Sequence, residues 1–163
     1  MPTNQPLGCL FSILNLFGLR PPRQTVAETL PYRRKDYLLS KAEASFFGVL
    51  NQALNGEYLI FVKIRLADLL YLPRNTESWQ SHFNRIQSKH VDFVVCRRDG
   101  IRPCLAVELD DSSHERPDRV SRDDFVVKAL QAAGLPLLRV RGASTYNVSK
   151  LRQDVDDLMR APQ

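Results

Sequence analysis

Two apolar runs of strand length constrain most strongly how this chain can fold. Residues 91–96 read VDFVVC and residues 104–109 read CLAVEL, and the segment between them, RRDGIRP, contains an Asp-Gly turn signal and a proline. Runs of this length and composition on either side of a short turn predict a β-hairpin. Because successive positions are apolar, we expect the hairpin to lie in a sheet that is covered on both faces.

The register of this hairpin predicts a patch of carboxylates. If Cys96 faces Cys104, the same antiparallel register sets Asp92 opposite Glu108. Side chains alternate between the two faces of a strand, so Asp110 shares the face of Glu108. A register slip of two residues would preserve the patch, and a slip of one residue would disperse it.

Carboxylates gathered in this way need a compensating charge, because mutual repulsion and desolvation both oppose ionisation. Mg²⁺ prefers oxygen ligands, keeps several waters and typically binds about one or two carboxylates beside a substrate phosphate. One interpretation is a metal site in which Asp92, Glu108 and Asp110 hold Mg²⁺ or Mn²⁺. The alternative is that Asp92 caps the start of a strand while Glu108, Asp110 and Asp111 are solvated at a strand end.

Several separate sequence words resemble one known family. The words KHVDFVVC, LAVELDDSSH, RDDF and AGLPLLRV resemble the domain of unknown function 2726 family, over about residues 36–142. The order of Asp92, then Glu108-Leu109-Asp110 at a strand end, then a helix and another strand, is similar to that of the PD-(D/E)XK nucleases. Within that superfamily the family is similar to the very-short-patch-repair endonucleases.

The resemblance implies both a fold and an activity. It implies an α/β fold with a restriction endonuclease-like core, in which helices flank a mixed central sheet. It also implies a Mg²⁺-dependent endonuclease that hydrolyses phosphodiester bonds of nucleic acid, DNA in particular. Asp92 and Glu108 are the metal ligands that it implies for this chain.

The chain departs from the superfamily pattern at Asp110, where a lysine usually orients or activates the attacking water. Three residues are candidates to replace that lysine: Lys89, His114 and Lys128. Lys89 points away from Asp92 by strand parity unless the chain bends before the strand begins. His114 suits a general base because imidazole titrates near neutral pH, although a lone histidine in a polar loop is commonly just exposed.

Three further residues are possible accessories of the site. Ser40 and Glu43 form the pattern of a capping box, so Glu43 either stabilises its own helix or completes the metal site, as the resemblance implies. Lys63 belongs to a family word of the form K-x-R-L-A-D and either reaches the site or faces the sheet edge. The family word RDDF places Asp123 near the site, whereas Asp124 is better explained as a cap partner of the helix that begins at Ser121.

Three arginines follow the acidic run in the sequence: Arg116, Arg119 and Arg122. In a nuclease they would bind nucleic acid by clamping a metal-bound phosphate, and otherwise they neutralise the acidic run. The whole chain has 23 Lys and Arg against 18 Asp and Glu, a formal net charge of +5, which suits a polyanionic partner without demonstrating one. Three cysteines at these spacings form neither a zinc site nor a disulfide framework, so we expect a cytoplasmic protein.

The sequence divides into two parts. Residues 1–35 are an apolar N-terminal segment and a Pro/Arg linker, and residues 36–160 are the predicted nuclease-like domain. The apolar run at residues 7–19 is shorter than the roughly 20 residues that a spanning helix needs. It is therefore interpreted as a segment for weak membrane or protein contact, with possible membrane association.

Apolar periodicity predicts the remaining elements. We expect helices that begin near Ser40 and Ser121, a helical insertion within residues 73–88, and a C-terminal helix at 148–159, with strands at 58–66 and 135–140. Two functions remain open on these grounds: a metal-dependent nuclease, and a nuclease-like domain that has lost its catalytic lysine and binds nucleic acid or a protein partner. A membrane-proximal interaction domain is a third hypothesis, motivated by residues 7–19.

Overall fold

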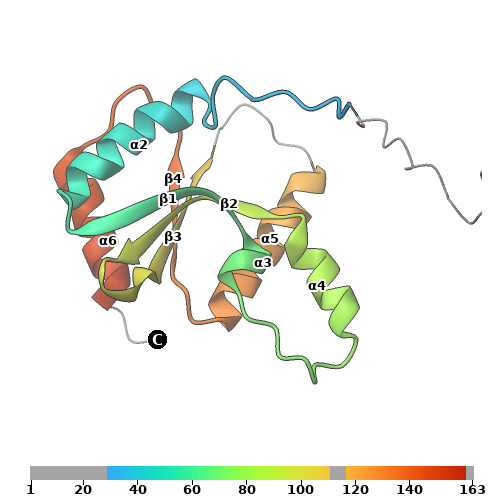
Figure 1. Cartoon of the computed structure of the whole chain (residues 1–163). Helices are drawn as coiled ribbons and strands as arrows, with labels where there is room; N and C mark the ends of the chain where they lie inside the picture. The colour runs from blue at the N-terminus through green and yellow to red at the C-terminus, as the bar shows by residue number, and fades with distance from the viewer. Residues whose placement is uncertain (1–28, 111–116, 161–163) are drawn as a thin grey trace, which may run out of the picture. The chain divides into compact units, whose positions relative to one another are not determined.

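The computed structural model describes residues 29–110 and 117–160, with the backbone alone for residues 117–124. From Asp36 onward the chain forms one compact unit. Its elements, labelled in Figure 1, are α2 (Lys41–Leu54), β1 (Tyr58–Arg65), α3 (Leu66–Leu69), α4 (Trp79–Gln87), β2 (His90–Arg97), the 3₁₀ turn η1 (Asp99–Ile101), β3 (Arg102–Asp110), α5 (Pro117–Ala132), β4 (Leu137–Arg141) and α6 (Val148–Arg160).

The four strands form one mixed sheet in the order β1-β2-β3-β4. The β1–β2 and β2–β3 pairs are antiparallel, and β4 pairs with β3 in parallel after the α5 crossover. Helices α2 and α6 lie on one side of the sheet, and α3, α4 and α5 lie on the other (Figure 1). The predicted α/β class, with a mixed sheet flanked by helices, is confirmed.

Each face of the sheet has its own hydrophobic core. The first cluster joins the sheet to α2 and α6, and its buried members include Phe46, Leu50, Phe93, Leu105 and Val107. The second joins the opposite face to α3, α4 and α5 through Leu66, Ile86, Val94, Ala106 and Leu130. Burying one such aliphatic or aromatic side chain contributes about 1.5–3 kcal/mol. Successive residues of a strand face the two different cores, which explains why successive positions are apolar.

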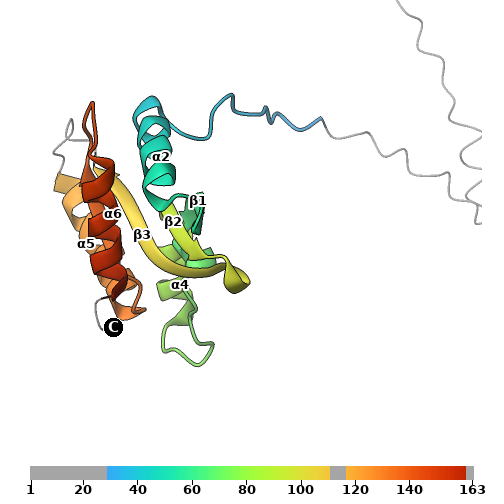
Figure 2. The ribbon, with the colours of Figure 1, turned by 90° about the vertical axis from the view of Figure 1, so that its left-hand side faces the viewer.

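The predicted hairpin is confirmed, but one detail of its register is wrong. The pairing shifts by one residue between Val95 and Cys96, so Cys96 pairs with Pro103 and not with Cys104. Figure 2 shows β2 and β3 running side by side into the connecting turn. Pro103 has no N–H to donate to a regular ladder, and the extra residue forms a β-bulge beside the turn. Cys104 packs against the α2/α6 core and Cys96 against the other core.

Two helix starts test the capping predictions. The capping box of α2 is confirmed: the Ser40 hydroxyl accepts from the N–H of Glu43 at 3.3 Å, and the Glu43 carboxylate accepts from the N–H of Ser40 at 2.9 Å. Helix α5 begins at Pro117 and not at Ser121. Proline is favoured at the first helical position, where a missing N–H costs nothing, so the helix starts one turn earlier than predicted.

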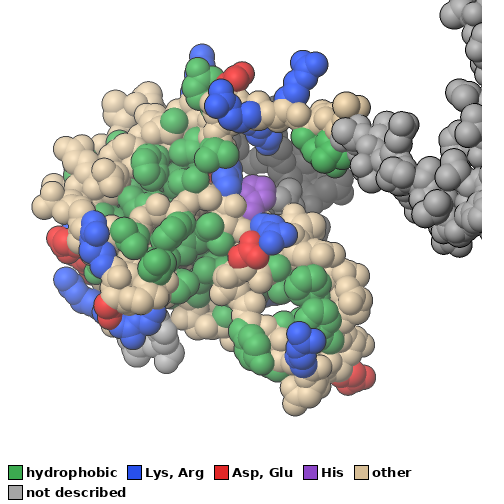
Figure 3. Space-filling view, viewed as in Figure 1, with side chains coloured by type: hydrophobic (Ala, Val, Ile, Leu, Met, Phe, Trp, Pro, Cys, Tyr) green, Lys and Arg blue, Asp and Glu red, His purple; other side chains and the backbone are tan. Residues whose placement is uncertain are grey.

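Strand β1 is the outermost strand on its side of the sheet. Phe61 in its middle is 36% exposed, and Figure 3 shows apolar side chains gathered at the surface on this side of the molecule. Charged side chains near the end of the strand, Lys63 and Arg65, are the kind that discourage edge-to-edge pairing. No helix within the described ranges is long and apolar enough to cross a membrane, and residues 7–19 lie outside those ranges.

Candidate functional site

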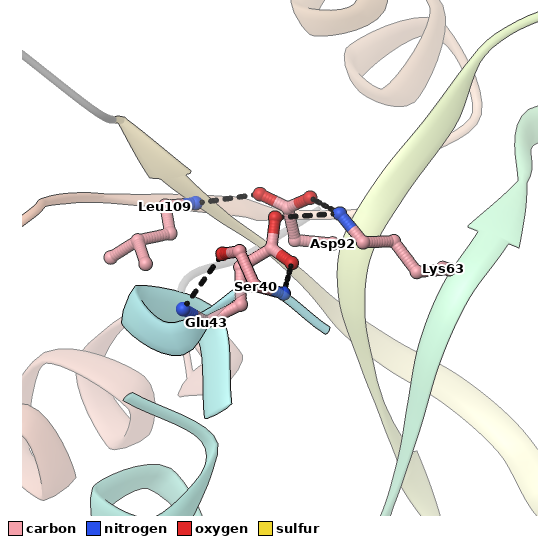
Figure 4. A network of polar contacts seen from close by, with 5 residues as sticks. All are labelled: Ser40, Glu43, Lys63, Asp92 and Leu109. Atoms are coloured by element: carbon pink, nitrogen blue, oxygen red, sulfur yellow. Dashed lines mark hydrogen bonds and ion pairs between the residues drawn. The ribbon is translucent and has the colours of Figure 1, made fainter. Parts of the chain in front are cut away.

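The candidate site lies at the edge of the sheet where β1, β3 and β4 end and β2 begins. These three strands run in the same direction, because β1 and β3 are both antiparallel to β2 and β4 is parallel to β3. The first turn of α2 reaches the same edge. Figure 4 shows Glu43 from α2, Lys63 from β1 and Asp92 from β2 converging there.

Lys63 is the central contact of this group. Its ammonium nitrogen Nζ donates to Glu43 Oε1 at 2.7 Å and to Asp92 Oδ1 at 2.7 Å. The side chains are 28% exposed for Lys63 and 18% for each of the two acids. Charge-assisted hydrogen bonds are stronger where water is partly excluded, so this arrangement is held more firmly than a surface ion pair.

Asp92 also joins two strands. Its Oδ2 atom accepts a hydrogen bond from the backbone N–H of Leu109 at 3.1 Å. The regular β2–β3 pairing runs as far as Phe93 opposite Val107, so this contact lies one step beyond it. The predicted pairing of Asp92 with Glu108 would be the next step of this register and stays a prediction. The Asp92 side chain is therefore fixed in place by backbone on one side and by Lys63 on the other.

Glu43 accepts hydrogen bonds from two partners. Oε2 accepts from the N–H of Ser40, its own N-cap, while Oε1 accepts from Lys63. The helix-capping interpretation is confirmed, and a part in metal binding stays a prediction. Partial burial by itself raises the pKa of Glu43, but the hydrogen bonds and charge of Lys63 and the bonds to Ser40 outweigh it, so the pKa lies below its usual 4.5.

The backbone of β1 is distorted at Lys63. Lys63 has a φ of 55°, in the left-handed region that a residue with a long side chain seldom adopts inside a strand. Val62 packs against the α2/α6 core, whereas Ile64, two residues along, packs against the opposite core. In a regular strand these two side chains would lie on one face. The strand therefore changes faces at Lys63.

Strand β2 changes faces at the same level. Phe93 packs against the α2/α6 core and Val91 against the opposite core, with Asp92 between them. The pairs Val62–Phe93 and Ile64–Val91 flank Lys63 and Asp92 in the register. Backbone in sparsely populated regions costs on the order of 1–3 kcal/mol and is concentrated at functional sites. The strain falls on the residue that brings the ammonium to Asp92.

Partial burial by itself lowers the pKa of Lys63. Its hydrogen bonds to Asp92 and Glu43, together with their negative charges, outweigh that effect and raise the pKa above its usual 10.5. Lys63 is therefore a cation throughout the physiological pH range. One positive charge stands between two negative ones.

The other predicted carboxylates have different surroundings. Both oxygens of Asp110 accept from Arg139 of β4, at 2.8 and 3.1 Å. Glu108, two positions earlier on β3, is partly buried. In the parts of the chain that the structure describes, no three His, Cys, Asp or Glu side chains gather closely enough to hold a metal ion. The three predicted carboxylates are thus not assembled into one metal-holding group.

Two of the three lysine substitutes can be located. Lys89 donates to the backbone carbonyl of Arg85 at 2.9 Å and lies 5.0 Å from the ring centroid of Phe125, on the α4 and α5 side of the sheet. Lys128 is exposed on α5. His114 and Arg116 lie outside the described residues, and the same holds for the side chains of Arg119, Arg122 and Asp123 in α5. Their predicted roles remain predictions.

The sequence left Lys63 among the accessories, although the structure puts it at the centre. Two signals pointed to it. It is a lysine within a strand that is otherwise almost wholly apolar, YLIFVKIR, and it opens the word K-x-R-L-A-D. The backbone distortion that turns it toward Asp92 has no such signal, because a non-glycine residue with positive φ cannot be recognised from its type.

A comparison with protein families gives one match. The family model described as "Protein of unknown function (DUF2726)" matches residues 35–158, which is most of the chain. The chain belongs to this family. No curated protein and no solved structure matches it. The match covers every element from α2 to β4 and most of α6, including Glu43, Lys63 and Asp92.

The donor atoms at this edge are suited to a hard cation. Mg²⁺ is commonly held by about one or two carboxylates, with water and substrate phosphate completing its shell. Asp92 has a fixed carboxylate whose two oxygens each carry one hydrogen bond, and an ionised carboxylate has about four acceptor sites. Asp92 is therefore a carboxylate of the kind that Mg²⁺ or Mn²⁺ binds, and Glu108 is the nearest predicted ligand on β3 by continuation of the register.

Proposed function

We propose that this domain is a metal-dependent nuclease that hydrolyses phosphodiester bonds of nucleic acid. The observation that carries the proposal is the 2.7 Å contact between Lys63 and Asp92 at the sheet edge, with Glu108 next in the register. This contact brings an acid and a lysine together. In nucleases of the resembled type the lysine occupies the position that Asp110 has in this chain. The strained backbone at Lys63 supports a functional role for this pair.

Asp92 and Glu108 are the proposed ligands of Mg²⁺ or Mn²⁺. When bound, such an ion polarises a phosphoryl oxygen and lowers the pKa of a bound water. Asp92 suits the role because the Leu109 N–H fixes its orientation, and a ligand held in advance loses little freedom on binding. Hydrolysis would proceed without a covalent intermediate on the protein.

Lys63 is the proposed cationic group of the reaction. Its ammonium lies at the same edge as Asp92 and keeps its charge at neutral pH, so it can stabilise the negative charge that develops on a phosphate. Glu43 is a positioning residue, because it holds the ammonium from the first turn of α2. Lys63 thus takes the place that the sequence assigned to Lys89, His114 or Lys128.

A second function is favoured by one observation. Asp110 is neutralised by Arg139 and Asp92 by Lys63, and carboxylates that the protein's own cations neutralise need no metal ion, so such a site can bind nucleic acid or a protein partner without cutting it. The net charge of +5 suits nucleic acid. This alternative predicts salt-sensitive binding in the absence of any cleavage.

Cleavage assays separate the two functions. Purified protein is incubated with single-stranded, duplex and branched DNA and with RNA, in Mg²⁺, Mn²⁺ or EDTA. The proposal predicts cleavage that needs the cation and is lost in Asp92→Asn and Glu108→Gln. Glu57→Gln, at the other end of β1, is the matched control and retains activity. Binding without cleavage by the folded protein would replace the nuclease with the binding domain.

A further inference from the structure

We infer that Lys63 is an internal counter-cation, which neutralises Asp92 and Glu43 until a divalent cation binds and displaces its ammonium from Asp92. This inference rests on the proposed role of Asp92 as a metal ligand. It goes further by assigning a competition between a side chain of the protein and the metal ion. It also gives Lys63 two positions, one for each state of the site.

The contacts of Lys63 are those of an ion held in a site. A single ammonium bridges carboxylates from two separate elements, α2 and β2, at 2.7 Å each. The partners lie 20 and 29 residues away in the sequence, so only the folded chain brings them together. A bound cation would interact with the same oxygen atoms, since an ammonium and a metal ion both seek carboxylate lone pairs.

The two cations cannot share Asp92 without cost. A divalent ion on the Asp92 carboxylate would lie within a few ångström of the Lys63 ammonium, and like charges at that separation repel strongly where water is partly excluded. The Asp92 carboxylate is held by the Leu109 N–H, and turning away from a cation would break that hydrogen bond. The group that can move is the lysine ammonium, which ends a flexible stem of four carbons.

Glu43 provides the second position of the ammonium. Its carboxylate is held by the Ser40 N–H in the capping box and keeps one oxygen toward Lys63. When the cation takes Asp92, Lys63 can remain paired with Glu43 and turn its other N–H groups to an incoming phosphate. The same residue then keeps the empty site neutral and becomes available to substrate when the cation arrives.

Removing the Lys63 charge therefore has opposite effects on metal binding and on catalysis. In Lys63→Met the cation meets no competitor, and Asp92 and Glu43 repel each other until it binds. We expect Mn²⁺ to bind at least about tenfold more tightly to this variant than to the wild type. We also expect Mn²⁺ to raise its melting temperature by more than it raises that of the wild type. Cleavage falls nonetheless.

The experiment measures Mn²⁺ affinity by isothermal titration calorimetry or by electron paramagnetic resonance, using the full chain. Lys63→Arg keeps the charge and should bind Mn²⁺ no more tightly than the wild type. Lys89→Met is the matched control, because Lys89 contacts Arg85 and Phe125 and not Asp92. Lys63→Gln offers the same test with a polar side chain if Lys63→Met does not fold.

Each result has a distinct meaning. Tighter binding to Lys63→Met, with Lys63→Arg and Lys89→Met unchanged, supports the displacement. Equal or weaker binding of Mn²⁺ to Lys63→Met overturns the counter-cation role of Lys63 and leaves the proposed nuclease function unaffected. If neither the wild type nor any variant binds Mn²⁺ at millimolar concentration, the metal-dependent function is overturned as well.

Discussion

Two cations in this fold each bridge a pair of carboxylates, and they do so in different ways. Arg152 of α6 donates to Glu57 at 2.8 and 2.9 Å and to Asp156 at 3.0 Å, near the start of β1. Lys63 bridges Glu43 and Asp92 at the opposite end of that strand. The partners of Arg152 are 51% exposed for Glu57 and 23% for Asp156, whereas both partners of Lys63 are 18% exposed.

The two clusters also differ in the backbone conformation of the cation. Arg152 lies within a regular helix, and one of its contacts, with Asp156, is an ordinary contact between residues four apart. Lys63 lies in a strand that adopts a left-handed conformation at that one residue. Arg152 and Lys63 are buried to the same degree, with side chains 29% and 28% exposed, so the difference between them lies in the backbone. An ion pair on a regular helix needs only a structural role, but a cation on strained backbone needs a further explanation. The site chemistry proposed for Lys63 supplies it.

The largest difference between the two clusters is expected in cleavage, when the charge of Lys63 is removed. Lys63→Met should lower cleavage about 100-fold or more, because a fixed positive charge near the reacting phosphate is lost. It should also lower the free energy of unfolding by about 1–2 kcal/mol, since Glu43 and Asp92 then face each other with little water. Cleavage rates and urea unfolding of the purified variant measure both effects. Unchanged cleavage would remove Lys63 from the proposed mechanism.

Acid and base denaturation should test the contacts of Lys63 next. The folded pKa of Glu43 lies below 4.5, so its stabilisation is present above pH 4.5 and is lost as the pH falls through the folded value. The folded pKa of Lys63 lies above 10.5, so its stabilisation is present below pH 10.5 and is lost as the pH rises further. Unfolding free energies measured against pH should therefore vary less steeply in Lys63→Met at both extremes. Identical profiles would contradict these pKa shifts.

The strain at Lys63 can be tested apart from its charge. Lys63→Ala and Lys63→Gly both remove the ammonium, but only glycine adopts a φ of 55° without strain. We expect Lys63→Gly to be more stable than Lys63→Ala by about 0.5–1 kcal/mol, against the usual preference for alanine in a strand. Chemical denaturation of the two variants measures the difference. If Lys63→Ala is the more stable variant, the left-handed conformation assigned to residue 63 is wrong.

The smallest effect is expected at the other cluster. Arg152→Met removes a contact with the half-exposed Glu57 and a contact with Asp156 four residues along the same helix, and both kinds of ion pair contribute little. Cleavage and Mn²⁺ affinity should stay within about twofold of the wild type, with only a slight fall in melting temperature. A large loss of cleavage in this variant would place functional chemistry at the wrong end of β1.

Much of the fold could be predicted from local pattern. The hairpin follows from two apolar runs around an Asp-Gly turn, and the capping box follows from Ser40 and Glu43 at a fixed spacing. The bulge that moves Cys96 away from Cys104 could not be predicted, because a register shift depends on how the turn closes. The start of α5 was misplaced for a related reason, as a cap pattern at Ser121 competed with Pro117.

The candidate site was predicted in part. The predicted antiparallel register holds from Phe93 opposite Val107 to Val95 opposite Leu105, and Asp92 with Glu108 is its continuation. The pairing of Asp110 with Arg139 does not, because it depends on β4 lying beside β3 in one particular register. Lys63 reaches Asp92 only because its backbone leaves the regular strand. Parity rules, which assume regular strands, fail at the residue where the strand is distorted.

One measurement tests the central claim most directly. Wild-type protein and Asp92→Asn, purified identically, are compared for Mg²⁺-dependent cleavage of labelled DNA and RNA. Asp154→Asn on α6 serves as the control, since Asp154 pairs with Lys150 on that helix. The proposed function predicts cleavage by the wild type and the control that EDTA abolishes, and a loss of about 1,000-fold or more in Asp92→Asn. Equal cleavage by Asp92→Asn, or none by the folded wild type, would contradict it.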